Sequence, residues 1–168
     1  MLRLVTFNTS TSYKGLKTFD CGNEMINTFV YKSLKKRVKK HLSQAYILLD
    51  ENEKFVGFYT LDTFSINREI FELPHKQSGL PPIVPVIKLN MLGLDVSLQR
   101  QGIGQRLLRD ALVKVIEISK IAGCTGLYLL AEEEAVYFYE ELGFVALKHA
   151  TPLPMFLHIE KILESVDE

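Results

Sequence analysis

The sequence predicts a mixed fold of the α/β or α+β class, with helices packed on a sheet. Three observations predict this class: a hairpin pattern at 45–64, a long amphipathic helix directly after an apolar strand at 86–96, and short strands mixed with a helix beyond residue 126. The chain has 168 residues, 47% of them hydrophobic, which is enough for a core without disulfides or metal. We therefore expect one domain over residues 1–168.

The first half of the chain predicts a strand, a helix and a hairpin. Residues 2–7 form a short apolar and β-branched run typical of an edge strand, and residues 8–15 are rich in Ser, Thr and Gly. After Asn23, a good N-cap residue, apolar side chains recur at helical spacing to about Lys40. Residues 45–49 and 55–64 are predicted strands joined by the polar turn 50–54. The segment 66–85 contains four prolines, so we expect an ordered crossover or loop that holds at most one short helix.

The second half predicts the central strand and the longest helix. The apolar segment 86–96 is expected to be a central strand, in which Gly93 marks a bulge or a close approach by ligand or backbone. Residues 104–121 carry the strongest amphipathic pattern and end at Gly123. Further strands are expected at 127–131, 144–147 and 155–160, with a short helix over 132–142.

Composition excludes several classes of protein. The 20 basic and 20 acidic residues give a formal net charge of zero, so net charge alone indicates no nucleic-acid or membrane partner. Cys21 and Cys124 are far apart and stand in no metal-binding motif, so we expect no metal site. No apolar run approaches the ~18 residues of a membrane span, and the N-terminus turns polar too early for a signal peptide. We expect a cytoplasmic protein with reduced thiols.

A glycine-containing loop opens the long predicted helix. The segment from Gln99 to Gln105 holds Gly102 and Gly104, which let the backbone approach an anion at a helix start with unpaired N–H groups. This arrangement suits a pyrophosphate, although an ordinary turn before a helix has the same spacing. A Walker loop is excluded because Gly-Lys-Ser/Thr is absent, and the dinucleotide fingerprint lacks its third glycine, where Leu107 stands.

Two tyrosines lie on the short helix predicted at 132–142. A phenol with a pKa near ~10 stays protonated at neutral pH and can return a proton to a leaving thiolate. Tyr137 and Tyr139 taken alone are more typical of packing residues, because tyrosines on short helices usually pack.

Together these segments resemble the GNAT superfamily of acyl-CoA-dependent N-acetyltransferases. The resemblance rests on Gln99-x-x-Gly102-x-Gly104 before a long helix and on Phe138-Tyr139-x-x-x-Gly143-Phe144 near the end of the chain. It implies a single-domain GNAT fold, with a mixed, mostly antiparallel twisted sheet, a bulged central strand and flanking helices. It implies acetyl-CoA as cosubstrate without a metal, and Tyr139 as the general acid for the CoA thiolate. The implied pantetheine contacts are Leu92, Gly93 and Leu94, and the implied pyrophosphate contacts are Arg100, Gln101, Gly102, Ile103, Gly104 and Gln105.

A narrower resemblance is to the GNAT toxins of bacterial toxin–antitoxin modules. It rests on Phe19-Asp20-Cys21-Gly22-Asn23, on the strand 56–61, on the proline-rich segment and on 92–99. It implies the α-amine of aminoacyl-tRNA as acceptor and a small ribbon-helix-helix antitoxin as partner; a homodimer stays open. The sequence departs from that group at Met91, where an arginine is common, and in its neutral net charge.

The basic residues of the first predicted helix are candidate tRNA contacts. Six cations and no acid occur within 32–40, and the proposed phosphate contacts are Lys32, Lys35, Lys36, Lys39 and Lys40. A solvated helix face explains the same pattern. No general base stands out, since Asp62 and Asp95 are more typical of structural roles. An α-amine, with a pKa of about 8, has roughly a tenth of its molecules neutral at pH 7, so it needs a base less than a lysine does. Acetylation of a small-molecule or protein amine, and non-catalytic acyl-CoA binding, remain alternatives.

Overall fold

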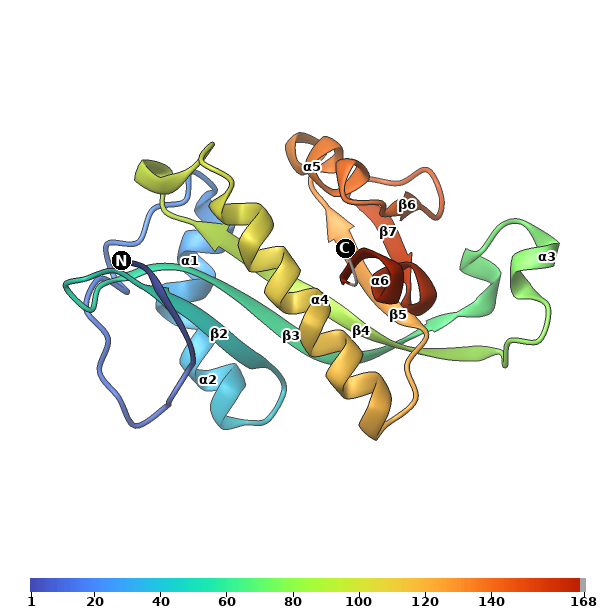
Figure 1. Ribbon diagram of the computed structural model, residues 1–168, viewed down its shortest axis with the longest axis horizontal. Helices are drawn as coiled ribbons and strands as arrows, with labels where there is room; N and C mark the ends of the chain where they lie inside the picture. Colours follow the sequence, from blue (N-terminus) through green and yellow to red (C-terminus); the bar gives the residue numbers. More distant parts are fainter. Residues whose placement is uncertain (167–168) are drawn as a thin grey trace. The chain divides into compact units, whose positions relative to one another are not determined.

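The computed structural model describes residues 1–166 and divides into two compact units (Figure 1). The first unit comprises Met1–Asp62 and Asn90–Ala111. The second comprises Thr63–Leu89 and the described residues from Leu112 onward. Strands β3 (Phe55–Asn67) and β4 (Ile83–Leu94) and helix α4 (Ile103–Ile121) contribute residues to both units. Each unit is described separately below, and the prediction of a single domain over 1–168 stays a prediction.

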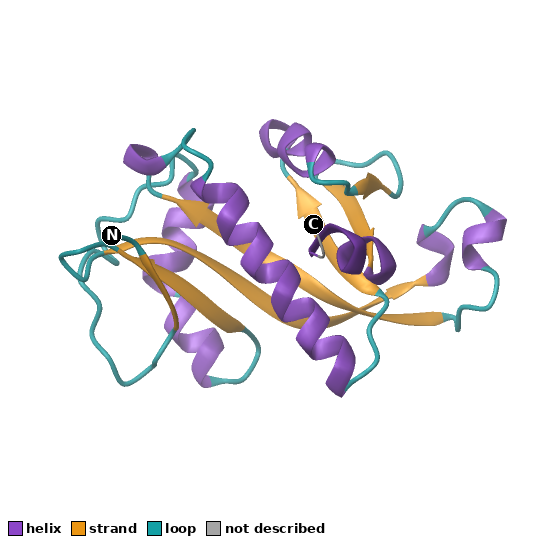
Figure 2. Ribbon diagram, in the orientation of Figure 1, coloured by secondary structure: helices purple, strands orange, loops and turns teal. Residues whose placement is uncertain are grey.

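The strands follow the order β1-β2-β3-β4-β5-β7-β6 in a seven-stranded sheet. The remaining strands are β1 (Arg3–Thr6), β2 (Gln44–Leu49), β5 (Gly126–Ala131), β6 (Val145–Ala146) and β7 (Leu153–His158). The pairs β1–β2, β2–β3, β5–β7 and β6–β7 are antiparallel, whereas β4 and β5 are parallel. The predicted fold class, a mixed and mostly antiparallel sheet with flanking helices, is confirmed (Figure 2).

In the first unit, helices α1 (Glu24–Lys32) and α2 (Leu34–Lys39) pack on the hairpin formed by β2 and β3. The core contains Phe29 and Leu34 from the helices and Ile47, Phe55 and Phe58 from the strands. The expected single helix to Lys40 is therefore wrong. It breaks at Ser33, whose backbone is non-helical (φ −122°, ψ −30°) while its N–H donates to the Phe29 carbonyl.

The proline-rich segment differs from the expected loop because both flanking strands extend into it. β3 continues to Asn67 and β4 begins at Ile83, with the Arg68 N–H bonded to the Pro82 carbonyl at 3.0 Å. Between the two strands lie a 3₁₀ turn at Arg68–Ile70 and the expected short helix, α3 (Pro74–Gln77), joined by turns. β4 ends at Leu94 rather than at residue 96, and a 3₁₀ turn at Val96–Leu98 follows.

The second unit holds α5 (Val136–Glu141) and α6 (Ile159–Val166). A 3₁₀ turn at Glu133–Ala135 replaces the first part of the helix predicted at 132–142. The strand predicted over 155–160 ends at His158, and α6 begins one residue later. Ile162 of α6 is fully buried, which fixes this helix on the sheet and explains why its apolar residues follow helical spacing.

Two features are absent from residues 1–166. No helix there is long and apolar enough to cross a membrane. Within the same residues, no cluster of His, Cys, Asp and Glu has the arrangement of a metal site.

Candidate active site

The loop before α4 adopts the conformation that an anion-binding helix start requires. Arg100 and Gly102 have positive φ values of 62° and 79°. The first helical hydrogen bond runs from the Arg106 N–H to the Gly102 carbonyl at 3.3 Å, so the three preceding N–H groups lie outside the helical ladder. A Cβ placed on Gly102 meets no atom within 4 Å. The loop thus presents open space and N–H donors at the positive end of a 19-residue helix.

Side chains hold the turn that leads into this loop. Asp95 accepts hydrogen bonds from the Ser97 N–H at 3.0 Å and the Ser97 hydroxyl at 2.8 Å. The Gln99 amide donates to the Leu94 and Cys21 carbonyls, both at 2.8 Å. Gln99 therefore ties the end of β4 to the segment before α1. This role was not predicted, because its partners are backbone carbonyls that no sequence pattern identifies.

The implied pantetheine strand, Leu92–Leu94, lies at the end of β4 in the first unit. The neighbouring Met91 N–H donates to the hydroxyl of Thr60 on β3 at 3.1 Å, and Thr60 is fully buried. Gly93 packs closely on α1: a Cβ there stands 3.0 Å from Ile26 and 3.1 Å from Phe58. Close packing accounts for this glycine, while the bulge expected beside it stays a prediction.

Tyr139 lies on α5 in the second unit and is 9% exposed. Its ring makes edge-to-face contacts with Phe138 and Phe144, with centroids 5.1 and 5.5 Å apart. Burial raises the pKa of the Tyr139 phenol to about 12, because the phenolate loses solvation in this apolar setting. The phenol therefore stays protonated throughout the physiological range.

Tyr137, two residues earlier, has a different environment. It is 71% exposed, and a hydrogen bond from its hydroxyl to Glu141 raises the pKa of its phenol. Of the two tyrosines, only Tyr139 has the desolvated setting that suits a proton donor to a buried leaving group.

The candidate RNA-contacting lysines are exposed on α1, α2 and the C-cap of α2. Within residues 1–166, no carboxylate lies within ion-pair distance of any of these five side chains: Lys32, Lys35, Lys36, Lys39 and Lys40.

Arg37 does not belong to that exposed set. Its Nη2 lies 3.1 Å from Asp62 Oδ2 on β3, and its Nε donates to the Ser43 hydroxyl at 2.9 Å. Asp62 is thus engaged in a structural ion pair, and Asp95 is engaged in the turn before α4. The other oxygen of Asp62, Oδ1, is buried and accepts no hydrogen bond from any described residue, so the ion pair with Arg37 engages only half of this carboxylate.

Comparison with known proteins identifies the family. Residues 42–146 match the acetyltransferase (GNAT) domain, and the chain belongs to this family. The family resemblance predicted from the sequence is confirmed.

The similar proteins include toxins. The tRNA-acetylating toxin of Mycobacterium tuberculosis is 32% identical over 93 residues, which are 54% of this chain and 55% of that protein, so the match spans about half of this curated relative. A crystal structure of a bacterial toxin has a TM-score of 0.92 at 32% identity and covers 100% of this chain and 96% of its own.

Two AtaT structures are similar over nearly the whole chain. AtaT complexed with acetyl-methionyl-tRNAfMet gives a TM-score of 0.89 at 30% identity, covering 98% of this chain and 99% of its own. An AtaT mutant toxin bound to the C-terminus of the antitoxin AtaR and acetyl-CoA gives 0.85 at 27% identity, covering 99% of both chains.

Proposed function

We propose that this protein transfers the acetyl group of acetyl-CoA to the α-amine of aminoacyl-tRNA, as the toxin of a toxin–antitoxin pair. The observation that carries the proposal is the near-full-length similarity to AtaT complexed with acetyl-methionyl-tRNAfMet, combined with the buried phenol of Tyr139. We extend the proposal to an antitoxin partner, which AtaT has in AtaR, and to the cytoplasm, where acetyl-CoA and charged tRNA occur together.

The acetyl-CoA contacts proposed are those that the sequence predicted. Loop residues 100–105 hold the pyrophosphate through backbone N–H groups, and the open side of Gly102 leaves room for it. The end of β4, from Leu92 to Leu94, offers backbone groups to the pantetheine arm. The Gln99 and Asp95 hydrogen bonds fix both elements before the ligand binds, which lowers the entropic cost of binding.

The proposed reaction is direct attack of a neutral amine on the thioester carbonyl. The C–N bond forms and the C–S bond breaks, so the sulfur leaves as a thiolate and the nitrogen releases its proton to solvent. Tyr139 donates a hydrogen bond, and then a proton, to the departing sulfur and regains a proton from solvent.

The proposed reaction needs no dedicated general base, because an acceptor amine of low pKa is already partly neutral at pH 7. Asp62 and Asp95 are both engaged in structural hydrogen bonds. An α-amine of pKa ~7.7 to 8 is roughly one tenth neutral at pH 7, whereas a lysine of pKa ~10.4 is neutral in well under a thousandth of molecules. The proposal assigns neither carboxylate as a general base, which is consistent with an acceptor of low pKa.

The test is incubation of the purified protein with radiolabelled acetyl-CoA and charged total tRNA, with uncharged tRNA and a panel of small amines as parallel acceptors. We expect label on charged tRNA only, and its loss in Tyr139→Phe. Label on a small amine, with none on charged tRNA, contradicts the proposed acceptor. CoA binding without transfer to any acceptor contradicts the enzymatic proposal as a whole.

A further inference from the structure

A row of side chains crosses one face of the sheet in the second unit. Lys88 on β4 is the register partner of Tyr128 on β5, and Tyr128 is the partner of Phe156 on β7. Directly paired residues project from the same face of a sheet. Phe64 from β3 joins them, because its ring stacks on Tyr128 with centroids 5.6 Å apart and planes 10° apart. We call Phe64, Lys88, Tyr128 and Phe156 the aromatic row.

The two stacked rings differ in exposure. Tyr128 is 7% exposed and Phe64 is 42% exposed, so Phe64 is the member of the pair that faces solvent. The Lys88 ammonium lies 4.8 Å from the centroid of the Phe64 ring, within cation–π distance. Among residues 1–166, no carboxylate lies within ion-pair distance of Lys88. An exposed aromatic ring beside a cation without a counter-ion suits a ligand that is both planar and anionic.

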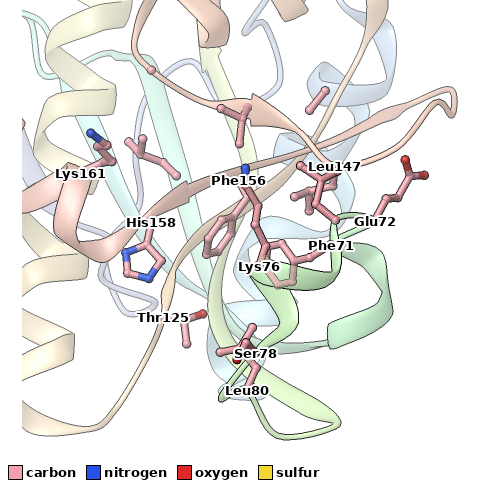
Figure 3. A pocket seen from close by; sticks show the side chains of 15 residues that line it. Phe71, Glu72, Lys76, Ser78, Leu80, Thr125, Leu147, Phe156, His158 and Lys161 are labelled. Carbon is pink, nitrogen blue, oxygen red and sulfur yellow. The ribbon is translucent and has the colours of Figure 1, made fainter.

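The row continues into a pocket of about 750 Å³ that Phe156 helps to line (Figure 3). Phe71 meets Phe156 edge to face in its apolar lining, with centroids 5.4 Å apart. Lys76, Lys161 and Glu72 also line it, and the Lys161 ammonium lies 3.5 Å from the carboxylate of Glu164 on the same helix. The pocket therefore combines aromatic surface with charged side chains at its edge.

His158 adds a hydrogen-bond donor to this pocket. Its Nδ1 accepts a hydrogen bond from the Glu160 N–H at 3.1 Å. With Nδ1 accepting, the imidazole carries its proton on Nε2, which makes Nε2 a hydrogen-bond donor.

We propose that the aromatic row and its pocket bind the unpaired 3′ end of the acceptor RNA. One base stacks on Phe64, its phosphate contacts Lys88, and a neighbouring nucleotide enters the pocket, where Lys76 supplies positive charge and the Nε2–H of His158 a donor. Interleaved aromatic rings and cations are the arrangement by which proteins hold single-stranded nucleic acid. This inference rests on the proposed function, since it assigns the site that recognises the RNA end carrying the acceptor amine.

The experiment measures KM for charged tRNA and, separately, the affinity for a short single-stranded RNA. Phe64→Leu keeps an apolar side chain without the π surface, and Phe64→Trp keeps the stacking surface. Lys88→Gln removes the charge, with Lys120→Gln as a matched exposed control. We expect Phe64→Leu to raise both KM and the RNA Kd by roughly 5- to 100-fold, with Phe64→Trp near wild type. We expect Lys88→Gln to lower the salt dependence of RNA binding by about 0.7 in log–log slope, with no change in Lys120→Gln.

The outcomes separate this inference from the proposed function. If the wild type acetylates charged tRNA but Phe64→Leu and Lys88→Gln leave KM and RNA affinity unchanged, the aromatic row is not the RNA site and the proposed function stands. If the wild type acetylates only small amines and does not bind the RNA, both fail. Loss of affinity for a planar organic anion such as naphthalene sulfonate, with RNA affinity intact in the same variants, overturns the RNA assignment in favour of a small-molecule site.

Discussion

Replacement of Tyr139 by phenylalanine tests the proposed chemistry most directly. The substitution removes one hydroxyl and keeps the ring that packs on Phe138 and Phe144. The removed hydroxyl acts on the sulfur only as its charge develops, so we expect KM for acetyl-CoA to stay near the wild-type value. We expect kcat to fall by about 10²-fold.

The expected fall in kcat follows from whether the phenol transfers its proton fully or only donates a hydrogen bond. At a pKa of about 12, full proton transfer to a thiolate of pKa ~8.5 is uphill by about 3.5 units, or about 5 kcal/mol. The phenol therefore acts first as a hydrogen-bond donor to the sulfur as its charge develops. A hydrogen bond to a charged group contributes about 1.5 to 3 kcal/mol, which corresponds to roughly 10- to 150-fold in rate.

The same pKa gives a stability signature that is independent of activity. A phenol whose folded pKa is raised from ~10 to about 12 contributes stability that is fully present below pH 10 and is lost as pH rises towards 12. At pH 11 this loss is about 1.4 kcal/mol for the wild type and absent in Tyr139→Phe. Urea unfolding of both proteins at pH 7 and pH 11 measures the difference.

Steady-state kinetics with charged tRNA from pH 6 to pH 10.5 completes the assay. The wild-type rate should rise through the acceptor pKa near ~8 and show no decline that belongs to the phenol. An unchanged kcat in Tyr139→Phe, in a variant that unfolds like the wild type at pH 7, would refute the reasoning. So would a phenol that titrates near pH 10.

Three further predictions concern packing and charge. Arg37→Ala should lower the free energy of unfolding by about 1 to 3 kcal/mol because it leaves the mostly buried Asp62 unpaired, and the Arg37→Met/Asp62→Leu double variant should lose less; urea unfolding of the set checks this. Gly126→Ala should destabilise by about 3 kcal/mol or more, since a Cβ there collides with the Leu157 carbonyl of β7; a folded variant with wild-type Tm contradicts the packing described. We expect glutamate substitution of the exposed Lys35, Lys36, Lys39 and Lys40 to raise KM for charged tRNA at least 10-fold without affecting KM for acetyl-CoA. An unchanged KM for charged tRNA assigns these lysines to an ordinary solvated surface.

The elements predicted best are those whose apolar spacing is long and regular. Helix α4 matches its prediction within a residue because Leu107, Leu108 and Ala111 recur on one buried face over five turns. The break at Ser33 was missed because the apolar spacing continues across it, while the backbone turns. The end of β7 was missed because Ile159 and Ile162 are as compatible with a strand as with a helix over so few residues.

The candidate site was predictable where glycine spacing and backbone geometry carry it. Gly102 and the helix start at Ile103 follow from local sequence alone. The contacts that support this loop do not, because Gln99 and Cys21 are 78 positions apart and meet only in the folded chain. For the same reason the sequence did not separate Arg37 from the five neighbouring lysines in the basic segment 32–40. Its partner Asp62 lies 25 residues away on β3.

The spacing of Phe138-Tyr139-x-x-x-Gly143-Phe144 has a physical explanation in α5. Residues two apart on a helix point to nearly opposite sides, so Tyr139 is buried while Tyr137 faces solvent. Gly143, with φ of 97°, reverses the chain, which lets the Phe144 N–H donate to the Tyr139 carbonyl at 3.1 Å. That reversal brings the Phe144 ring against Tyr139, and this apolar contact helps to desolvate the phenol. The glycine and the second phenylalanine thus help to raise the pKa of Tyr139, which is consistent with the proposed role of this phenol as a proton donor.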